Sequence, residues 1–229
     1  MEKIILGRSG LKVSKLGLEL SQLEKMSFAK SKELLDRAID SGINFFDIGM
    51  PIEELQKRIG HGTVGRRSDI VLAGSFVPCE PKVFERQLQT VLRALKTDYL
   101  DLCQIHDPDY LPRTGDEEGF YDAMMRAKEA GYIRSIGITT GSDLIAFRAL
   151  DFGWYDTLQY PWSKDSAEED REYVRFANMA QVGTISVPQG EVPTRNTLCE
   201  EMKVQGEWEG HSTLFLLGED FPFDWQESL

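Results

Sequence analysis

Short apolar runs alternate with helical patterns along this chain from about residue 16 onward. Around residues 34–39 the apolar side chains recur at the three- and four-residue spacing that places them on one face of a helix. Gly42 follows, in a position where glycine commonly ends a helix. Continuous short apolar runs are instead typical of strands buried on both faces. The pattern predicts strands at 45–46, 70–73, 99–105, 133–138, 157–160 and 183–187, and helices at 34–39, 84–95, 117–130, 143–152 and 165–181.

At least seven strand–helix alternations follow one another without a linker or a change in composition. Repeated units of this kind predict an all-parallel sheet in an α/β protein. This number in one chain favours a closed (β/α)8 TIM barrel, a single domain over residues 1–229. An open doubly wound sheet is the alternative, and it fits less well because no glycine-rich phosphate-binding turn follows the first strand. The glycine-rich segment 60–65 lies between a helix and a strand, so we expect a loop there.

The net charge of −12 argues against nucleic acid and anionic membranes as partners, because both require basic protein surface. No apolar run approaches the roughly 20 residues that cross a bilayer, and the N-terminal residues lack the apolar core of a secretory signal. The three cysteines form no CxxC pair, so neither a disulfide framework nor a zinc site is indicated. We expect a reduced, cytoplasmic setting. His61 and His211 fall in expected loops and are predicted to be surface residues.

Chemistry in a (β/α)8 barrel belongs at the carboxyl ends of the strands. A carboxylate or a histidine there carries more weight than a serine, threonine or glutamine, because burying an unpaired charge costs on the order of several kcal/mol. We expect a small-molecule ligand in this mouth of the barrel. The polar and aromatic residues at the expected strand ends are Glu19, Asp47, Ser75, His106, Thr139, Thr140, Gln159, Trp162, Ser186 and Gln189.

Four segments carry a specific likeness to one family. Residues 6–14 resemble an N-terminal hairpin, residues 42–47 a second barrel strand, residues 95–106 a fourth strand with its active-site histidine, and residues 131–138 a fifth strand. Over about residues 4–190 the chain resembles the aldo-keto reductases in these segments. The resemblance implies a (β/α)8 barrel, and in that family the barrel reduces carbonyl compounds with NADPH.

The resemblance carries only two of the family's four catalytic groups onto this chain. Asp47 and His106 match the family's aspartate and histidine, whereas Ile52 stands where the tyrosine belongs and Ser75 where the lysine belongs. In the family the lysine lowers the pKa of the tyrosine, which protonates the carbonyl oxygen as hydride arrives at carbon. Without that proton donor we expect hydride transfer to be lost.

The resemblance also retains few of the residues that bind the cofactor in the family. Gln159 matches a nicotinamide contact of the family, but residues 139–140 are two threonines where the family has an asparagine. Residues 213–218 are the expected eighth strand, and Glu219 and Asp220 follow them where the family has a basic phosphate-binding segment. We therefore expect a barrel shortened at its C-terminus, with no bound NADPH, no other cofactor and no metal.

Glu19 stands at a position where the family usually carries glycine. There it would obstruct a nicotinamide and place a second carboxylate beside Asp47, so that one of the two can act as an acid and the other as a base. His106 would shuttle a proton or hold an oxyanion. The leading hypothesis is cofactor-independent acid–base chemistry, of the lyase, isomerase or cyclase type, on a small carbonyl or polyol compound. Ser75, Gln159 and Trp162 would bind that compound.

Other interpretations remain open on the sequence alone. Asp47 and His106 would be inherited remnants bonded to each other, with Glu19 pointing to solvent, in a non-catalytic binding or regulatory subunit that has a protein partner. A residual NADP-dependent oxidoreductase is a third function. A metal site built from Glu19, Asp47 and His106 is a weaker hypothesis, because residues on three strands provide no spacing motif.

Overall fold

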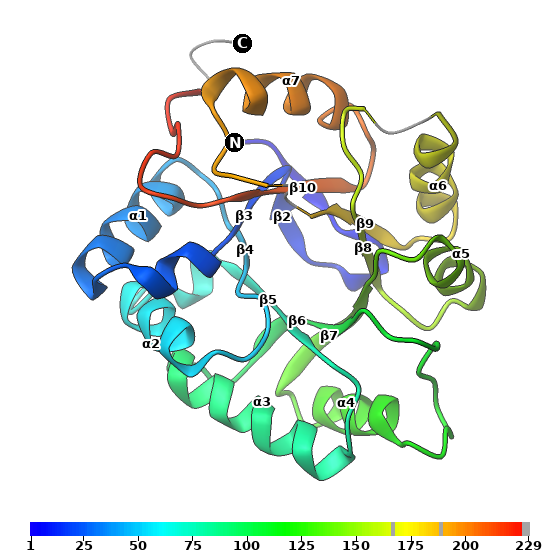
Figure 1. Cartoon of the computed structure of the whole chain (residues 1–229). Coiled ribbons are helices and arrows are strands. Elements are labelled where there is room, and N and C mark those ends of the chain that lie inside the picture. The colour runs from blue at the N-terminus through cyan, green and yellow to red at the C-terminus, as the bar shows by residue number, and fades with distance from the viewer. Residues whose placement is uncertain (166–167, 188–189, 226–229) are drawn as a thin grey trace.

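Eight parallel strands close into a barrel in the computed structural model, which describes residues 1–165, 168–187 and 190–225 (Figure 1). Around the barrel the order is β10-β3-β4-β5-β6-β7-β8-β9, so β10 pairs with both β9 and β3 and completes the ring. The predicted (β/α)8 fold is confirmed, and so is its eighth strand. The strands are β3 Leu16–Glu19, β4 Phe45–Asp47, β5 Val71–Phe76, β6 Leu100–His106, β7 Ile133–Thr139, β8 Thr157–Tyr160, β9 Gly183–Ser186 and β10 His211–Leu216.

Helices surround the barrel (Figure 1), and their buried apolar side chains join the hydrophobic core. On α1 the buried side chains include the four that the sequence pattern placed on one face, Leu34, Leu35, Ala38 and Ile39. Short three-residue and five-residue 3-10 helices complete the connections, among them Ser21–Lys25 directly after β3. The helices are α1 Phe28–Asp40, α2 Glu53–Gly62, α3 Pro81–Leu95, α4 Phe120–Glu129, α5 Asp143–Phe152, α6 Glu168–Met179 and α7 Arg195–Gln205.

An antiparallel hairpin of β1 (Lys3–Ile5) and β2 (Lys12–Ser14) covers the end of the barrel where the strands begin. The Asn44 side chain, next to the start of β4, accepts a hydrogen bond from the Ser14 backbone N–H at 2.7 Å. Three apolar residues of the hairpin region pack with side chains of the barrel interior. The cluster contains Leu6, Leu11, Val13, Phe45, Val71, Ala73, Leu102, Ile185 and Leu214. The interior at this end of the barrel is therefore filled by apolar side chains.

The prediction of a loop over residues 60–65 was wrong for its first half. Helix α2 continues through Gly62, and only the residues after it form a turn. Gly60 and Gly62 both lie where neighbouring helices approach too closely for a side chain. A Cβ on Gly60 would lie 2.4 Å from the Ala94 carbonyl oxygen of α3, and one on Gly62 would lie 2.5 Å from a methyl group of Leu35 on α1. The glycines therefore mark close helix packing.

The prediction of His211 as a surface residue was also wrong. It is the first residue of β10 and is 1% exposed, outside the barrel wall against α7. Its Nδ1 lies 2.9 Å from Thr184 Oγ1, and its Nε2 lies 2.9 Å from Ser186 Oγ and 3.0 Å from Gln205 Oε1. Burial lowers the pKa of His211 to about 3, so the imidazole is neutral and acts as a structural hydrogen-bonding group.

Substituting Gly60 tests the packing of α2 against α3. We predict that Gly60→Ala lowers the free energy of unfolding by about 1–2 kcal/mol, because the clash with α3 backbone exceeds the gain in helix propensity. Gly141→Ala is the matched control, since nothing lies within 4 Å of its added Cβ; it should change stability by less than about 0.5 kcal/mol. Urea unfolding measures both, and a Gly60→Ala protein as stable as the wild type would contradict the packing account.

Candidate active site

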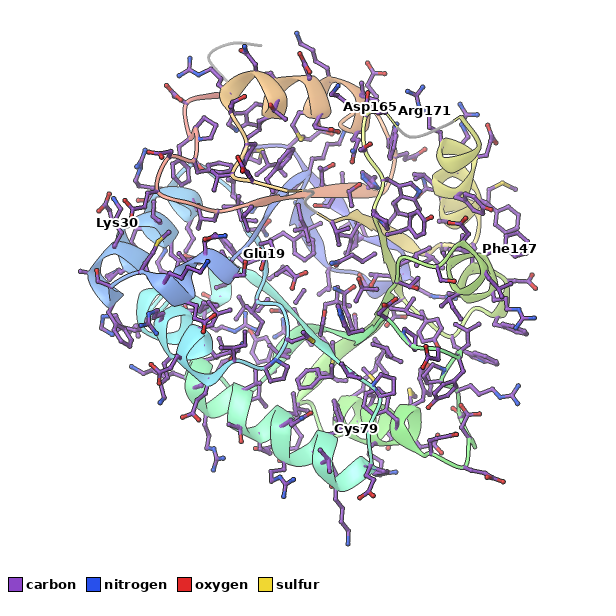
Figure 2. All side chains as sticks on the ribbon, viewed as in Figure 1. Glu19, Lys30, Cys79, Phe147, Asp165 and Arg171 are labelled. Atoms are coloured by element: carbon purple, nitrogen blue, oxygen red, sulfur yellow. The ribbon has the colours of Figure 1, made fainter. Side chains whose placement is uncertain are left out.

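Two carboxylates lie side by side at the mouth of the barrel. Glu19 and Asp47 are the last residues of β3 and β4, and they are directly paired in the parallel register. Paired residues of neighbouring parallel strands point to the same side of a sheet, here the barrel interior. Figure 2 shows Glu19 inside the ring of strands. The strand register therefore places Glu19 and Asp47 next to each other, as the sequence analysis predicted.

Asp47 is only 4% exposed. Its Oδ1 accepts a hydrogen bond from the Gly49 backbone N–H at 2.8 Å, and its Oδ2 accepts one from Gln159 Nε2 at 3.1 Å. Burial raises the pKa of Asp47 above its ordinary value, and these two hydrogen bonds and the nearby His106 oppose that rise. His106 thus acts on Asp47 through its charge, and the partners of the carboxylate are Gly49 and Gln159.

Glu19 is half-buried and folds back over the start of the next segment. Its Oε1 accepts from the Ser21 backbone N–H, and its Oε2 accepts from the Ser21 hydroxyl, both at 2.8 Å. Burial, followed by the charge of Asp47, raises the pKa of Glu19 from 4.5 to about 7. The pKa values of both carboxyls are therefore raised, so the pair retains a proton more readily than two isolated carboxyls would.

A chain of amides crosses the barrel below this pair. Gln104 Nε2 on β6 donates to Gln159 Oε1 on β8 at 2.6 Å, and Gln159 in turn donates to Asp47 on β4. Gln104 is fully buried and Gln159 is 4% exposed. Because Gln104 is a donor to the Gln159 oxygen, the NH2 group of Gln159 is turned toward Asp47. Both ends of the Gln159 amide are therefore engaged within the barrel.

Gln104 is a residue that the sequence analysis missed. A signal for it exists in the predicted strand 99–105, where an amide follows the apolar residues Leu102 and Cys103 two residues before His106. Side chains two apart on a strand share a face, so a His106 that faces the mouth implies a Gln104 that faces the interior.

The remaining predicted residues divide between the two sides of the barrel wall. Ser75 is 4% exposed and is paired in register with Gln104, and His106 is half-buried and paired with Thr139. Both share the interior side with the carboxylates. Trp162 lies elsewhere: its ring contacts those of Tyr160 and His211 with centroids 5.0 and 5.9 Å apart, and its carbonyl accepts from Gln205 of α7. Gln189 lies outside the described residues.

A cavity of about 160 Å³ opens on the side of the barrel where β9 and β10 end. Three of the side chains around it, Asp165, Glu191 and Glu201, are carboxylates, and its described lining contains no lysine or arginine. Glu219 and Asp220, just after β10, are both exposed. Glu19, Asp47 and His106 do not line this cavity. An anionic phosphate placed in this cavity would meet negative charge.

Among the residues that the structure describes, no group of three histidine, cysteine, aspartate or glutamate side chains is arranged to hold a metal ion. The weaker hypothesis of a metal site from Glu19, Asp47 and His106 is therefore wrong for this structure. Within the same residues, no helix has both the length and the apolar character needed to span a bilayer.

Comparison with known proteins identifies the class that this barrel belongs to. A sequence profile of the aldo/keto reductase family matches residues 3–145, and the chain belongs to that family. Aldo-keto reductase family 1 member C21 of Rattus norvegicus is 28% identical over 150 residues, which cover 54% of this chain and 46% of that protein. The chain spans about half the length of the curated relatives it matches.

Solved structures show the same fold. A putative aldo-keto reductase from Pseudomonas aeruginosa superimposes with a TM-score of 0.78 at 19% identity, over 99% of this chain and 95% of that one. An aldo-keto reductase from Klebsiella pneumoniae, solved in complex with NADPH, gives a TM-score of 0.68 at 19% identity, over 81% and 68% of the two chains.

Neutralising Glu19 should change how stability depends on pH. The folded state holds the Glu19 proton up to about pH 7, whereas the unfolded chain releases it near 4.5. Wild-type stability from this group is thus full below pH 4.5 and falls as pH rises to 7. We predict that Glu19→Gln gains roughly 2 kcal/mol relative to the wild type between pH 4.5 and 8, with allowance for solvent screening at a half-buried group.

Urea unfolding at several pH values measures this difference. Glu117→Gln is the control, because Glu117 is exposed and its substitution removes the same charge at another place. The difference in free energy of unfolding between Glu117→Gln and the wild type should stay constant with pH. A Glu19→Gln difference that is equally flat would show that Glu19 has an ordinary pKa.

Proposed function

We propose that this member of the aldo/keto reductase family catalyses proton transfer without a nicotinamide cofactor. Its reaction is an isomerisation or elimination on a small compound that carries a carbonyl group next to a hydroxyl group. The observation that carries the proposal is the Glu19–Asp47 pair, in which a proton-holding carboxyl with a pKa of about 7 lies beside a buried carboxylate.

Asp47 is the general base in this proposal. Its two hydrogen bonds fix the carboxylate plane, and each oxygen keeps further lone-pair capacity to accept a proton. The carboxylate removes the proton from the carbon beside the substrate carbonyl, and the electron pair of the broken C–H bond forms a C=C bond. The donation from Gln159, which Gln104 holds in orientation, opposes the rise in the pKa of Asp47 and so favours its ionised form.

Glu19 is the general acid. Its proton passes to the carbonyl oxygen as the C=C bond forms, so that a neutral enediol is produced and the two carboxyls have exchanged roles. Asp47 then gives its proton to the former carbonyl carbon, and Glu19 takes a proton from the hydroxyl group on the other carbon of the C=C bond. These two transfers complete an isomerisation. His106 lies at the same mouth and would donate a hydrogen bond to the oxygen on which charge develops. A pKa near the working pH suits both directions of transfer.

The residues at the mouth do not fit a phosphorylated nicotinamide dinucleotide. Gln159, the amide that matches a nicotinamide contact of the family, already bonds to Gln104 and Asp47. The cavity beside β10 and α7 is lined by three carboxylates, where a phosphate needs cationic or backbone N–H donors. Ile52, in the position of the family's tyrosine, caps α2 and carries no proton to give. These observations support chemistry that proceeds without a hydride donor.

Solvent exchange provides the test. The protein would be incubated in D2O with a panel of hydroxyacetone, dihydroxyacetone and glyceraldehyde, without nucleotide, and loss of the C–H signals beside the carbonyl followed by proton NMR. We predict exchange above the buffer rate that falls by about 100-fold in Asp47→Asn and in Glu19→Gln. The rate should also decline above about pH 7, where Glu19 loses its proton.

Glu117→Gln is the control and should exchange substrate at the wild-type rate. Wild-type rates equal to buffer across the panel, or rates that Asp47→Asn leaves unchanged, would contradict the proposal. A rise in melting temperature with millimolar NADPH would favour a residual oxidoreductase instead.

A further inference from the structure

Several large apolar side chains are exposed together on one pair of neighbouring helices. Of the twelve that are exposed among the described residues, five belong to the neighbouring helices α5 and α6. Soluble monomers seldom gather exposed apolar residues in one place unless the surface has a partner. The five residues, here named the α5–α6 patch, are Leu144 (60% exposed), Phe147 (50%), Phe152 (48%), Phe176 (47%) and Met179 (83%).

The two helices form a continuous face. They lie beside each other on the rim of the barrel in Figure 1, and the Phe147 ring meets the Tyr173 ring edge-on with centroids 6.3 Å apart. Figure 2 shows Phe147 at the outer edge of the molecule, away from the barrel interior. This surface is therefore separate from the mouth that holds Glu19 and Asp47.

The area of the patch is a large part of what a stable dimer interface requires. A half-exposed phenylalanine contributes roughly 100 Å², given the 150–250 Å² that such side chains bury. The five residues together expose roughly 500 Å² of apolar surface, within the range of functional patches on monomers. A standard interface buries about 800 Å² on each partner, so the patch would supply more than half of it and leave a polar rim.

Charge along α5 is complementary to an inverted copy of the same helix. In an interface about a two-fold axis every contact occurs twice. If residue i of one copy contacts residue j of the partner, then residue j of the first copy contacts residue i of the partner. If Phe147 lies opposite Phe152 of an antiparallel α5, then Arg148 lies opposite Asp151, and each contact occurs twice. Arg148 and Asp151 are exposed and form no ion pair within the described residues. The four positions share one helical face.

We propose that a second copy of this chain docks on the α5–α6 patch, with the two α5 helices antiparallel about a two-fold axis. The apolar residues of α5 form the centre of this interface, Phe176 and Met179 of α6 extend it, and the Arg148–Asp151 pairs fix the direction of the helices. These local attractions act against the repulsion of two chains that each carry a net charge of −12.

Sedimentation equilibrium over protein concentrations from about 1 to 300 µM tests the proposal. The wild type should show a monomer–dimer equilibrium, and Phe147→Glu should raise its dissociation constant at least tenfold. Val64→Glu is the matched control, because Val64 is an exposed apolar residue (62%) in the turn after α2; it should leave the constant unchanged. A wild type that stays monomeric throughout, or a dimer that Phe147→Glu leaves intact, overturns the proposal.

A charge exchange tests the antiparallel arrangement. Arg148→Asp and Asp151→Arg should each weaken the dimer about tenfold, because each places like charges opposite one another twice. The double variant restores opposite charges and should return the dissociation constant to within about threefold of the wild type. Both residues are exposed, so circular dichroism should show intact folds. Failure of the double variant to recover would overturn the antiparallel dimer.

Discussion

The parallel pairing of β3 with β4 is the constraint on which the candidate site depends. It fixes Glu19 opposite Asp47 at the same level of the barrel, so that both side chains leave the backbone on the interior side of neighbouring strands. Burial and the second negative charge raise the pKa of Glu19 to about 7, so this carboxyl keeps its proton at pH values where a free glutamate has lost it.

The rest of the barrel serves to hold that pair in place. Closure by β10 joins β9 to β3 and fixes where β3 ends. The N-terminal hairpin packs against the interior from below, and the amides of Gln104 and Gln159 support Asp47 from two further strands. Burying a carboxylate without such partners would cost several kcal/mol by the usual order of magnitude. The hydrogen bonds to Asp47 offset part of that cost and keep the charge where it is.

Much of this architecture could be predicted from the sequence. Strands such as 157–160 and the helix at 143–152 coincide with the observed elements, because apolar periodicity reports directly on burial. The proximity of Glu19 and Asp47 followed from the rule that strand ends of a barrel meet at one mouth. The orientation of the Gln159 amide did not follow, since it depends on a contact with Gln104, which is 55 residues away in the chain.

Other misses have equally specific causes. Glycine has two uses, and in segment 60–65 the sequence alone does not distinguish a flexible loop from the close helix packing seen at Gly60. His211 is polar by composition, yet three hydrogen-bonding partners on other elements make its burial favourable. Trp162 follows a strand by only two residues, but the chain turns there, and the ring packs outside the barrel wall.

A carboxyl titration of Glu19 by carbon-13 NMR would test the central claim most directly. The resonance can be assigned by its absence in Glu19→Gln, and the titration repeated in Asp47→Asn. The account predicts a pKa of about 7 in the wild type, and a lower value once the charge of residue 47 is removed. A wild-type pKa near 4.5 that Asp47→Asn leaves unchanged would show that the two carboxyls do not share a proton.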